Sequence, residues 1–185
     1  MRLIPLLLLL AACLPNIRYT LRGDDDFEGD GGIAVATEDG GISLVMDATD
    51  AERWSALDLD GGRVTVEEDS GWDLAFQRFE IKVNGGISGD GGVEVVAVSA
   101  MYQDDIEVPA GGWLTDEPDA DGDEVPEYAL LTWYSYDYET HLLNPAEVVY
   151  IVRTSEDALF KLAFDSYYDN SGTPARISLR FAPIN

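Results

Sequence analysis

The single histidine of the chain, His141, follows a stretch in which aromatic and polar residues alternate. A neutral imidazole ligates metals, haem iron included, and aromatic neighbours offer the apolar wall that a porphyrin needs. The aromatic residues of this stretch are Trp133, Tyr134, Tyr136 and Tyr138. The pattern also fits a structural or merely exposed histidine at the end of a strand. The residues alone leave both interpretations open, and favour the second.

A second group able to hold a ligand is acidic. Three carboxylates alternate around a glycine at Asp119, Asp121 and Asp123, as they do in calcium loops, because a hard cation prefers many oxygen ligands at one point. A full loop of the EF-hand type would place a glutamate at the twelfth position, where this chain has Leu130. A solvated acidic loop is therefore the favoured interpretation, and calcium is kept as a possible ligand.

Catalysis has little support in the sequence. A nucleophilic serine, threonine or cysteine needs a base, and the chain offers one histidine and one cysteine. Among 36 Asp and Glu residues a carboxylate pair can be found at any spacing, so such a pair is uninformative. We expect a protein that is not an enzyme.

The first residues have the order of an export signal: a charged start, an apolar run over residues 3–10, and then Ala11, Ala12 and Cys13. This spacing resembles the bacterial lipobox, in which the cysteine receives the lipid; the alternative is an ordinary signal peptide with a cysteine there by chance. We expect residues 1–12 to be removed and Cys13 to be lipidated. Leu14 is not the aspartate that can retain lipoproteins at the inner membrane, which favours the outer membrane or cell surface.

The net charge of −25 limits the partners. An acidic protein repels phosphate backbones and anionic lipid headgroups, and the 11 Lys and Arg residues do not cluster in the sequence. We expect no nucleic-acid partner, and contact with a membrane through the lipid anchor only.

The elements that must position these residues are predicted to be strands. Residues 13–40 are predicted to be an acidic, Gly-rich tether, and residues 41–185 a single all-β domain, an antiparallel sandwich or open barrel of short strands with Gly-rich turns. The expected strands include a hairpin over residues 57–66 and later segments at 93–98, 129–138, 148–154, 159–164 and 177–181. A short helix is expected at residues 50–54.

In one segment the apolar residues change from even to odd positions. Trp72, Leu74 and Phe76 occupy even positions, whereas Phe79, Ile81 and Val83 occupy odd ones. The buried face therefore changes near Gln77 and Arg78, which predicts a bulge or a crossing between sheets.

The same segment carries a family resemblance. It reads Trp72-Asp73-Leu74-Ala75-Phe76-Gln77-Arg78-Phe79-Glu80-Ile81-Lys82-Val83-Asn84-Gly85-Gly86. This stretch resembles the signature of the HmuY-like family of haem-binding bacterial lipoproteins, and segments around Trp133, His141, Tyr150 and Phe164 are similar to the rest of that pattern in the same order. The resemblance covers roughly residues 50–182.

The resemblance implies a surface lipoprotein that takes up haem and passes it toward an outer-membrane receptor, with two axial side chains on the iron. His141 would match one axial histidine. The chain has no second histidine, so Met101 or, with less support, Tyr102 is the candidate for the other ligand, since methionine and tyrosine both ligate haem iron. Haem propionates would need Arg78, Lys82 or Arg153 to face the site.

We therefore expect a membrane-anchored lipoprotein that binds haem for iron and haem acquisition. The alternative is a lipoprotein that keeps the same β scaffold without paired haem ligands and binds another small ligand or partner, with calcium at the acidic loop as one form of it.

Overall fold

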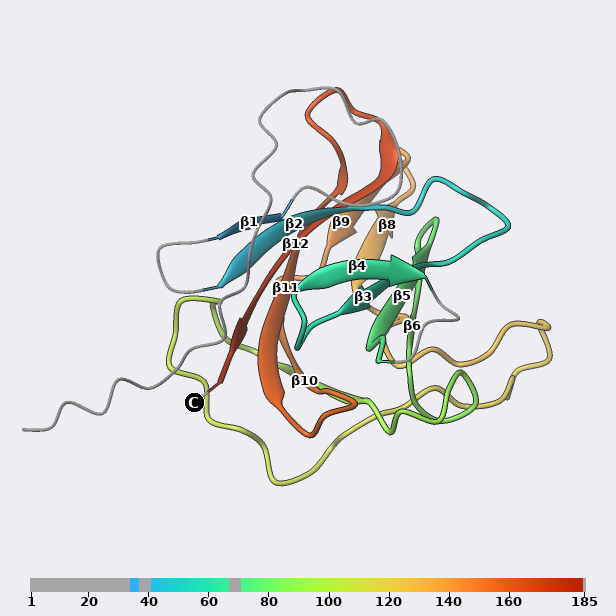
Figure 1. Cartoon of the computed structure of the whole chain (residues 1–185). Helices are drawn as coiled ribbons and strands as arrows, with labels where there is room; N and C mark the ends of the chain where they lie inside the picture. Colours follow the sequence, from blue (N-terminus) through green and yellow to red (C-terminus); the bar gives the residue numbers. More distant parts are fainter. Residues whose placement is uncertain (1–33, 37–40, 67–70, 185) are drawn as a thin grey trace, which may run out of the picture.

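The computed structural model describes residues 34–36, 41–66 and 71–184, and all its regular structure there is β (Figure 1). The strands are β1 Ala34–Ala36, β2 Ile42–Asp47, β3 Ser55–Asp58, β4 Arg63–Val66, β5 Leu74–Gln77, β6 Glu80–Val83, β7 Glu94–Val98, β8 Tyr134–Asp137, β9 Leu142–Pro145, β10 Val149–Arg153, β11 Leu159–Tyr168 and β12 Pro174–Pro183.

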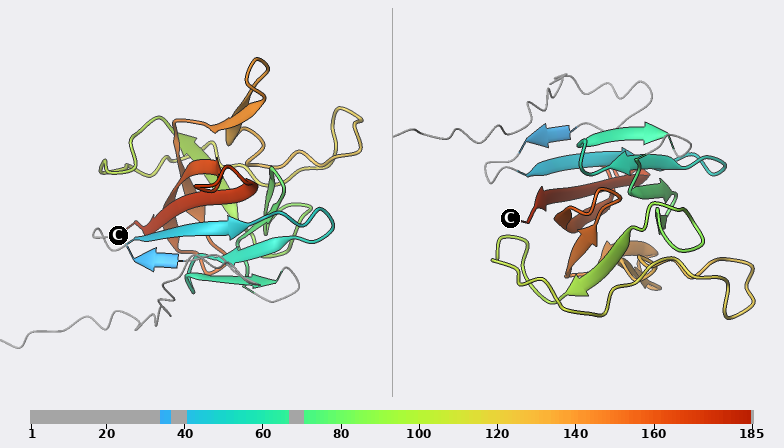
Figure 2. Two further views of the ribbon diagram at one scale, coloured as in Figure 1. Left: turned by 90° about the horizontal axis from the view of Figure 1, so that it is seen from above. Right: turned by 60° about the horizontal axis from the view of Figure 1, so that its bottom comes forward.

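These strands form three antiparallel sheets. The largest has the order β1-β2-β12-β11-β10-β7, the second has the order β4-β3-β5-β6, and β8 pairs with β9 alone. Figure 2 shows the two larger sheets lying against each other, and the β8–β9 hairpin, in orange, contacts β11, where the Leu143 N–H donates to the Tyr168 hydroxyl. The prediction of an all-β antiparallel fold is confirmed, and the sheets form a sandwich rather than a barrel.

The sandwich follows from the alternation of side chains along its strands. In β12 the residues Ile177, Leu179 and Phe181 are buried, whereas Arg176, Ser178 and Arg180 between them are only half-buried. The second sheet sends Leu57, Leu74, Phe76, Ile81 and Val83 into the same core cluster. Burial of these two apolar faces holds the sheets together.

The parity change at Gln77 and Arg78 is neither a bulge nor a crossing, and that prediction is wrong. β5 and β6 form a tight hairpin in which Phe76 lies opposite Ile81 and Leu74 lies opposite Val83. Directly opposite residues share a face, so an even position pairs with an odd one across a two-residue turn.

Other expectations need correction. Residues 50–54 form no helix: the Asp50 carboxylate accepts the backbone N–H groups of Glu52 and Arg53, and the chain bends there before it enters β3 at Ser55. The strand expected at 129–138 is restricted to β8, since residues 129–132 are turns. Asn144 and Pro145, residue types common in turns, belong to β9.

The β structure begins before the predicted boundary between tether and domain. β1 pairs with β2 although it lies within the range predicted as tether, so strand pairing begins before residue 41. The export signal and Cys13 lie outside the described residues.

Trp133 joins the β8–β9 hairpin to the sandwich. Its side chain is fully buried, its ring lies 4.8 Å from that of Phe164 and 6.2 Å from that of Tyr167, and its Nε1–H donates to the Phe79 carbonyl over 2.8 Å. Because β8 begins one residue later, the position of the hairpin depends on this indole.

We predict that Trp133→Phe lowers the free energy of unfolding by about 2–4 kcal/mol, because it leaves a cavity and removes the buried hydrogen bond to Phe79. Urea unfolding of the soluble domain measures the change. The matched control is Trp113→Phe at a half-buried position, which should cost less than about 1 kcal/mol. Equal losses in the two variants would contradict the anchoring role of Trp133.

Candidate functional site

The turn of the β8–β9 hairpin carries His141 in an exposed position. Asp137 pairs with Leu142 across the hairpin, so residues 138–141 form the turn, and the His141 N–H donates to the Asp137 carbonyl over 2.8 Å. His141 has a φ of 58°, in the left-handed region that residues other than glycine rarely adopt. Left-handed residues of this kind cluster at functional sites, which makes this turn a candidate.

One nitrogen of the His141 ring is fixed within the hairpin. Nδ1 lies 2.7 Å from the hydroxyl oxygen of Tyr136, and the two rings are tilted at 45°. In the tautomer whose Nδ1–H donates to that hydroxyl, Nε2 carries the lone pair and can ligate a metal. A hydrogen bond at the second nitrogen is the usual way in which proteins orient a ligating histidine.

Apolar side chains around His141 are exposed. Tyr138 is 83% exposed, and Tyr136 and Leu142 are exposed by 40% and 44%. The rings of Tyr136 and Tyr138 meet edge to face at 5.0 Å. We call Tyr136, Tyr138, His141 and Leu142 the hairpin patch. It offers an imidazole beside flat apolar surface, which is the combination that a porphyrin face requires.

Met101 and Tyr102 lie elsewhere. Met101 is 62% exposed, with its sulfur 3.4 Å from the Gln103 amide nitrogen. In Figure 1 its segment, residues 99–112 in yellow-green, runs along the lower left, whereas the β8–β9 turn, in light orange, lies at the upper right. Tyr102 is buried between Lys161 and Arg180 on the outer face of the six-stranded sheet. The structure therefore does not bring either residue opposite His141.

The three cations expected near haem propionates have other contacts. Arg78 donates to the Thr49 carbonyl, and the Lys82 ammonium lies over the rings of Trp54 and Trp72. Arg153 pairs with Glu94 and stacks on Trp113. The hairpin patch has none of these three charges, so a porphyrin there would have its propionates in solvent.

The acidic loop is exposed and its carboxylates bond to their own backbone. Asp119 accepts the N–H groups of Gly122 and Glu124, which lower its pKa below the usual range, the Gly122 bond most of all. Asp121 accepts the N–H of Asp123, which in turn accepts that of Val125. Oxygens of Asp119, Asp121 and Glu127 lie within 4.8 Å of one another, so Glu127 stands where the sequence placed Asp123. These local bonds account for the loop without a cation.

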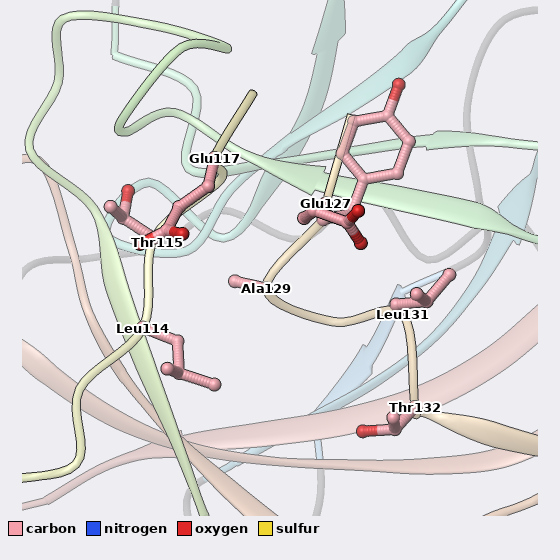
Figure 3. A pocket seen from close by; sticks show the side chains of 8 residues that line it. Leu114, Thr115, Glu117, Glu127, Ala129, Leu131 and Thr132 are labelled. Carbon is pink, nitrogen blue, oxygen red and sulfur yellow. The ribbon is translucent and has the colours of Figure 1, made fainter. Parts of the chain in front are cut away.

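A shallow groove lies at the base of the hairpin (Figure 3). It has a volume of about 270 Å³ and is lined by Leu114, Thr115, Glu117, Glu127, Tyr128, Ala129, Leu131 and Thr132. This volume is below the range of roughly 300–1,000 Å³ typical of pockets for drug-sized ligands. A porphyrin would therefore lie on the surface of the hairpin rather than inside this groove.

Structural roles explain several residues of the 72–86 segment. Asp73 accepts the N–H groups of Leu59 and Ser155, and the Asn84 amide donates to the Trp72 carbonyl. A Cβ on Gly85 would lie 2.2 Å from the Val93 carbonyl oxygen, so only glycine fits there. These contacts hold the scaffold together.

Comparison with known families identifies one match. The family model described as HmuY protein matches residues 50–181. A search of curated proteins finds no match.

Solved structures share the fold. A protein of Bacteroides fragilis described as a lipoprotein aligns with a TM-score of 0.63 and 18% identity over 82% of this chain and 95% of its own. An HmuY-like heme-binding protein of Bacteroides vulgatus gives 0.61 and 18%, covering 82% and 96% of the two chains. The apo HmuY analogue of Tannerella forsythia gives 0.61 and 16%, covering 85% and 100%. At such identities the likeness concerns the fold alone.

Proposed function

Because the chain belongs to the HmuY family, we propose that it is a membrane-anchored surface lipoprotein that binds haem through the imidazole of His141 and serves haem acquisition. The observation that carries the proposal is the hairpin patch, where an exposed imidazole held at Nδ1 stands among exposed aromatic and aliphatic side chains. The HmuY-like heme-binding protein of Bacteroides vulgatus shares the fold.

The residues of the hairpin would act in three ways. The hydrogen bond between the Tyr136 hydroxyl and Nδ1 would hold the orientation of His141, and in the tautomer whose Nδ1–H donates to that hydroxyl, Nε2 would be the ligating atom. Tyr138 and Leu142, whose side chains are exposed, would pack against the macrocycle and remove apolar surface from water. A haem bound in this way would supply an iron with one protein ligand, as in globins and peroxidases.

Ligation by Met101 stays a prediction with a structural condition attached. Its segment, residues 99–112, lies apart from the hairpin turn in Figure 1, so a thioether ligand opposite His141 requires that segment to move. Ligation by His141 alone needs no such movement.

We predict that hemin added to the soluble domain gives a shifted Soret band that is lost in His141→Ala, because that variant removes the only imidazole. Tyr136→Phe keeps the ligand but frees Nδ1, and should weaken binding roughly 10- to 100-fold. An absorbance titration measures both effects.

Met101→Leu separates the two forms of ligation in the same titration. Ligation by His141 alone predicts an unchanged Soret band and affinity, whereas ligation by Met101 as well predicts that both change. An unchanged band in His141→Ala, or no band shift at micromolar hemin in either oxidation state, would contradict haem ligation at the hairpin.

The proposed anchor is a lipid on Cys13. No helix in the described residues is long and apolar enough to span a membrane. Two or three acyl chains on one cysteine would hold the protein at a membrane essentially permanently. Haem caught at the hairpin would then be retained at the cell surface and could pass to an outer-membrane receptor.

We predict that the full chain, expressed in a bacterial host, partitions into the detergent phase of Triton X-114 and incorporates labelled palmitate. Cys13→Ser should lose both properties because it removes the thiol that forms the thioether. Detergent partitioning that survives in Cys13→Ser would contradict lipidation at this residue.

A second candidate function rests on the separation of His141 from the two residues that were candidates for the second haem ligand. Neither Met101 nor Tyr102 lies opposite His141, so the scaffold could serve a partner other than haem through the exposed rings of Tyr136 and Tyr138. The hemin titration separates the two candidates, because this one predicts no Soret shift.

A further inference from the structure

Three carboxylates meet at one end of the sandwich, away from the hairpin patch. Asp58 ends β3, Asp60 lies in the turn between β3 and β4, and Asp73 precedes β5. One oxygen of each lies within 4.8 Å of the others, and the side chains of Asp58 and Asp73 are buried. Like charges held this close, away from water, repel strongly.

Asp73 joins two turns that belong to different sheets. One of its carboxylate oxygens accepts the Leu59 N–H over 2.8 Å, in the turn between β3 and β4. The other accepts the N–H and the hydroxyl of Ser155 over 2.9 and 3.0 Å, in the turn between β10 and β11. The buried carboxylate therefore links one end of the four-stranded sheet, where β3 ends and β5 begins, to the β10–β11 turn of the six-stranded sheet.

Asp60 completes the cluster with an atom that lacks a partner. The Thr154 hydroxyl donates to its carboxylate, while Oδ2 is buried without a hydrogen bond. The other charges that act on Asp60 are negative: the carboxylates of Glu156 and Asp58. A buried acceptor among anions is costly unless it receives a proton.

Burial raises the pKa of both Asp60 and Asp73, and brings that of Asp73 to about 6. For Asp73 the hydrogen bonds from Ser155 and Leu59 oppose this rise, and the charge of Asp60 adds to it. Carboxylates that share a site commonly bind one proton between them.

We propose that Asp58, Asp60 and Asp73 form a proton-operated latch, in which one proton shared between Asp60 Oδ2 and a neighbouring carboxylate tightens the junction of the two sheets at mildly acidic pH. The proton turns Oδ2 from a buried acceptor without a partner into a donor. Its loss near neutral pH restores the repulsion and loosens the contact with Ser155.

The sign of the pH dependence follows from linkage. The pKa of Asp73 is higher in the folded state than its ordinary value of 3.8, so the folded state binds the proton more tightly. Stability is therefore gained as the pH falls through about 6, and lost as it rises. With these values the unfolding equilibrium constant should fall roughly tenfold from pH 7.5 to pH 5.

The test measures the cluster directly. Carbon NMR of the aspartate carboxyl groups should show Asp73 titrating near pH 6 in the soluble domain, and at a lower pH in Asp60→Asn, which removes the neighbouring charge. Urea unfolding at pH 7.5 and pH 5 should show a smaller pH effect in Asp60→Asn than in the parent. The matched control, exposed Asp90→Asn, should change neither result.

Two outcomes would overturn the latch. One is that neither Asp60 nor Asp73 titrates above pH 5. The other is that millimolar calcium chloride at pH 7.5 stabilises the parent domain and not Asp60→Asn, which would make the cluster a cation site. Neither result bears on hemin binding by His141, which is measured separately.

Discussion

The burial of the Trp133 indole between the two sheets is the constraint on which the rest of the molecule depends. The ring fills the core beside Phe164 and Tyr167, and its one polar atom is satisfied by the Phe79 carbonyl. An unsatisfied indole N–H at this depth would destabilise the core, so the ring and the turn after β5 are held in one arrangement. The β8–β9 hairpin leaves the sandwich from this fixed point, and so the place of His141 is set by core packing 8 residues earlier in the chain.

The scaffold and the candidate site obey different physical demands. In the 72–86 segment the side chains have structural roles: the Asp73 carboxylate accepts a buried backbone hydrogen bond, and Gly85 lies too close to its neighbours for a Cβ atom. The hairpin patch instead exposes aromatic and aliphatic side chains to water, in a chain that is otherwise rich in Asp and Glu. Exposed apolar surface beside an imidazole supports the proposal that this patch serves a ligand.

The strands and the antiparallel sandwich were predictable because apolar residues alternate with polar ones along the chain. Residues two positions apart lie on one face only in a strand, as Ile177, Leu179 and Phe181 do. The parity change at Gln77 was visible but misinterpreted, since a tight hairpin changes parity as surely as a bulge does. The turn at Asp50 depends on a side-chain bond to backbone that composition does not show. His141 could be named from its rarity, but its Tyr136 partner depends on strand register, and the meeting of Asp60 with Asp73 depends on tertiary contacts that sequence spacing cannot supply.

We propose above all that the His141 imidazole ligates the haem iron through Nε2. Because the chain has one histidine, labelling all histidine with ¹⁵N marks that ring alone. We expect the two ring-nitrogen signals to shift or broaden beyond detection when one equivalent of hemin is added, since a paramagnetic iron would be directly bonded to the imidazole. Ring signals that stay at their original positions and widths in the presence of hemin would contradict the claim.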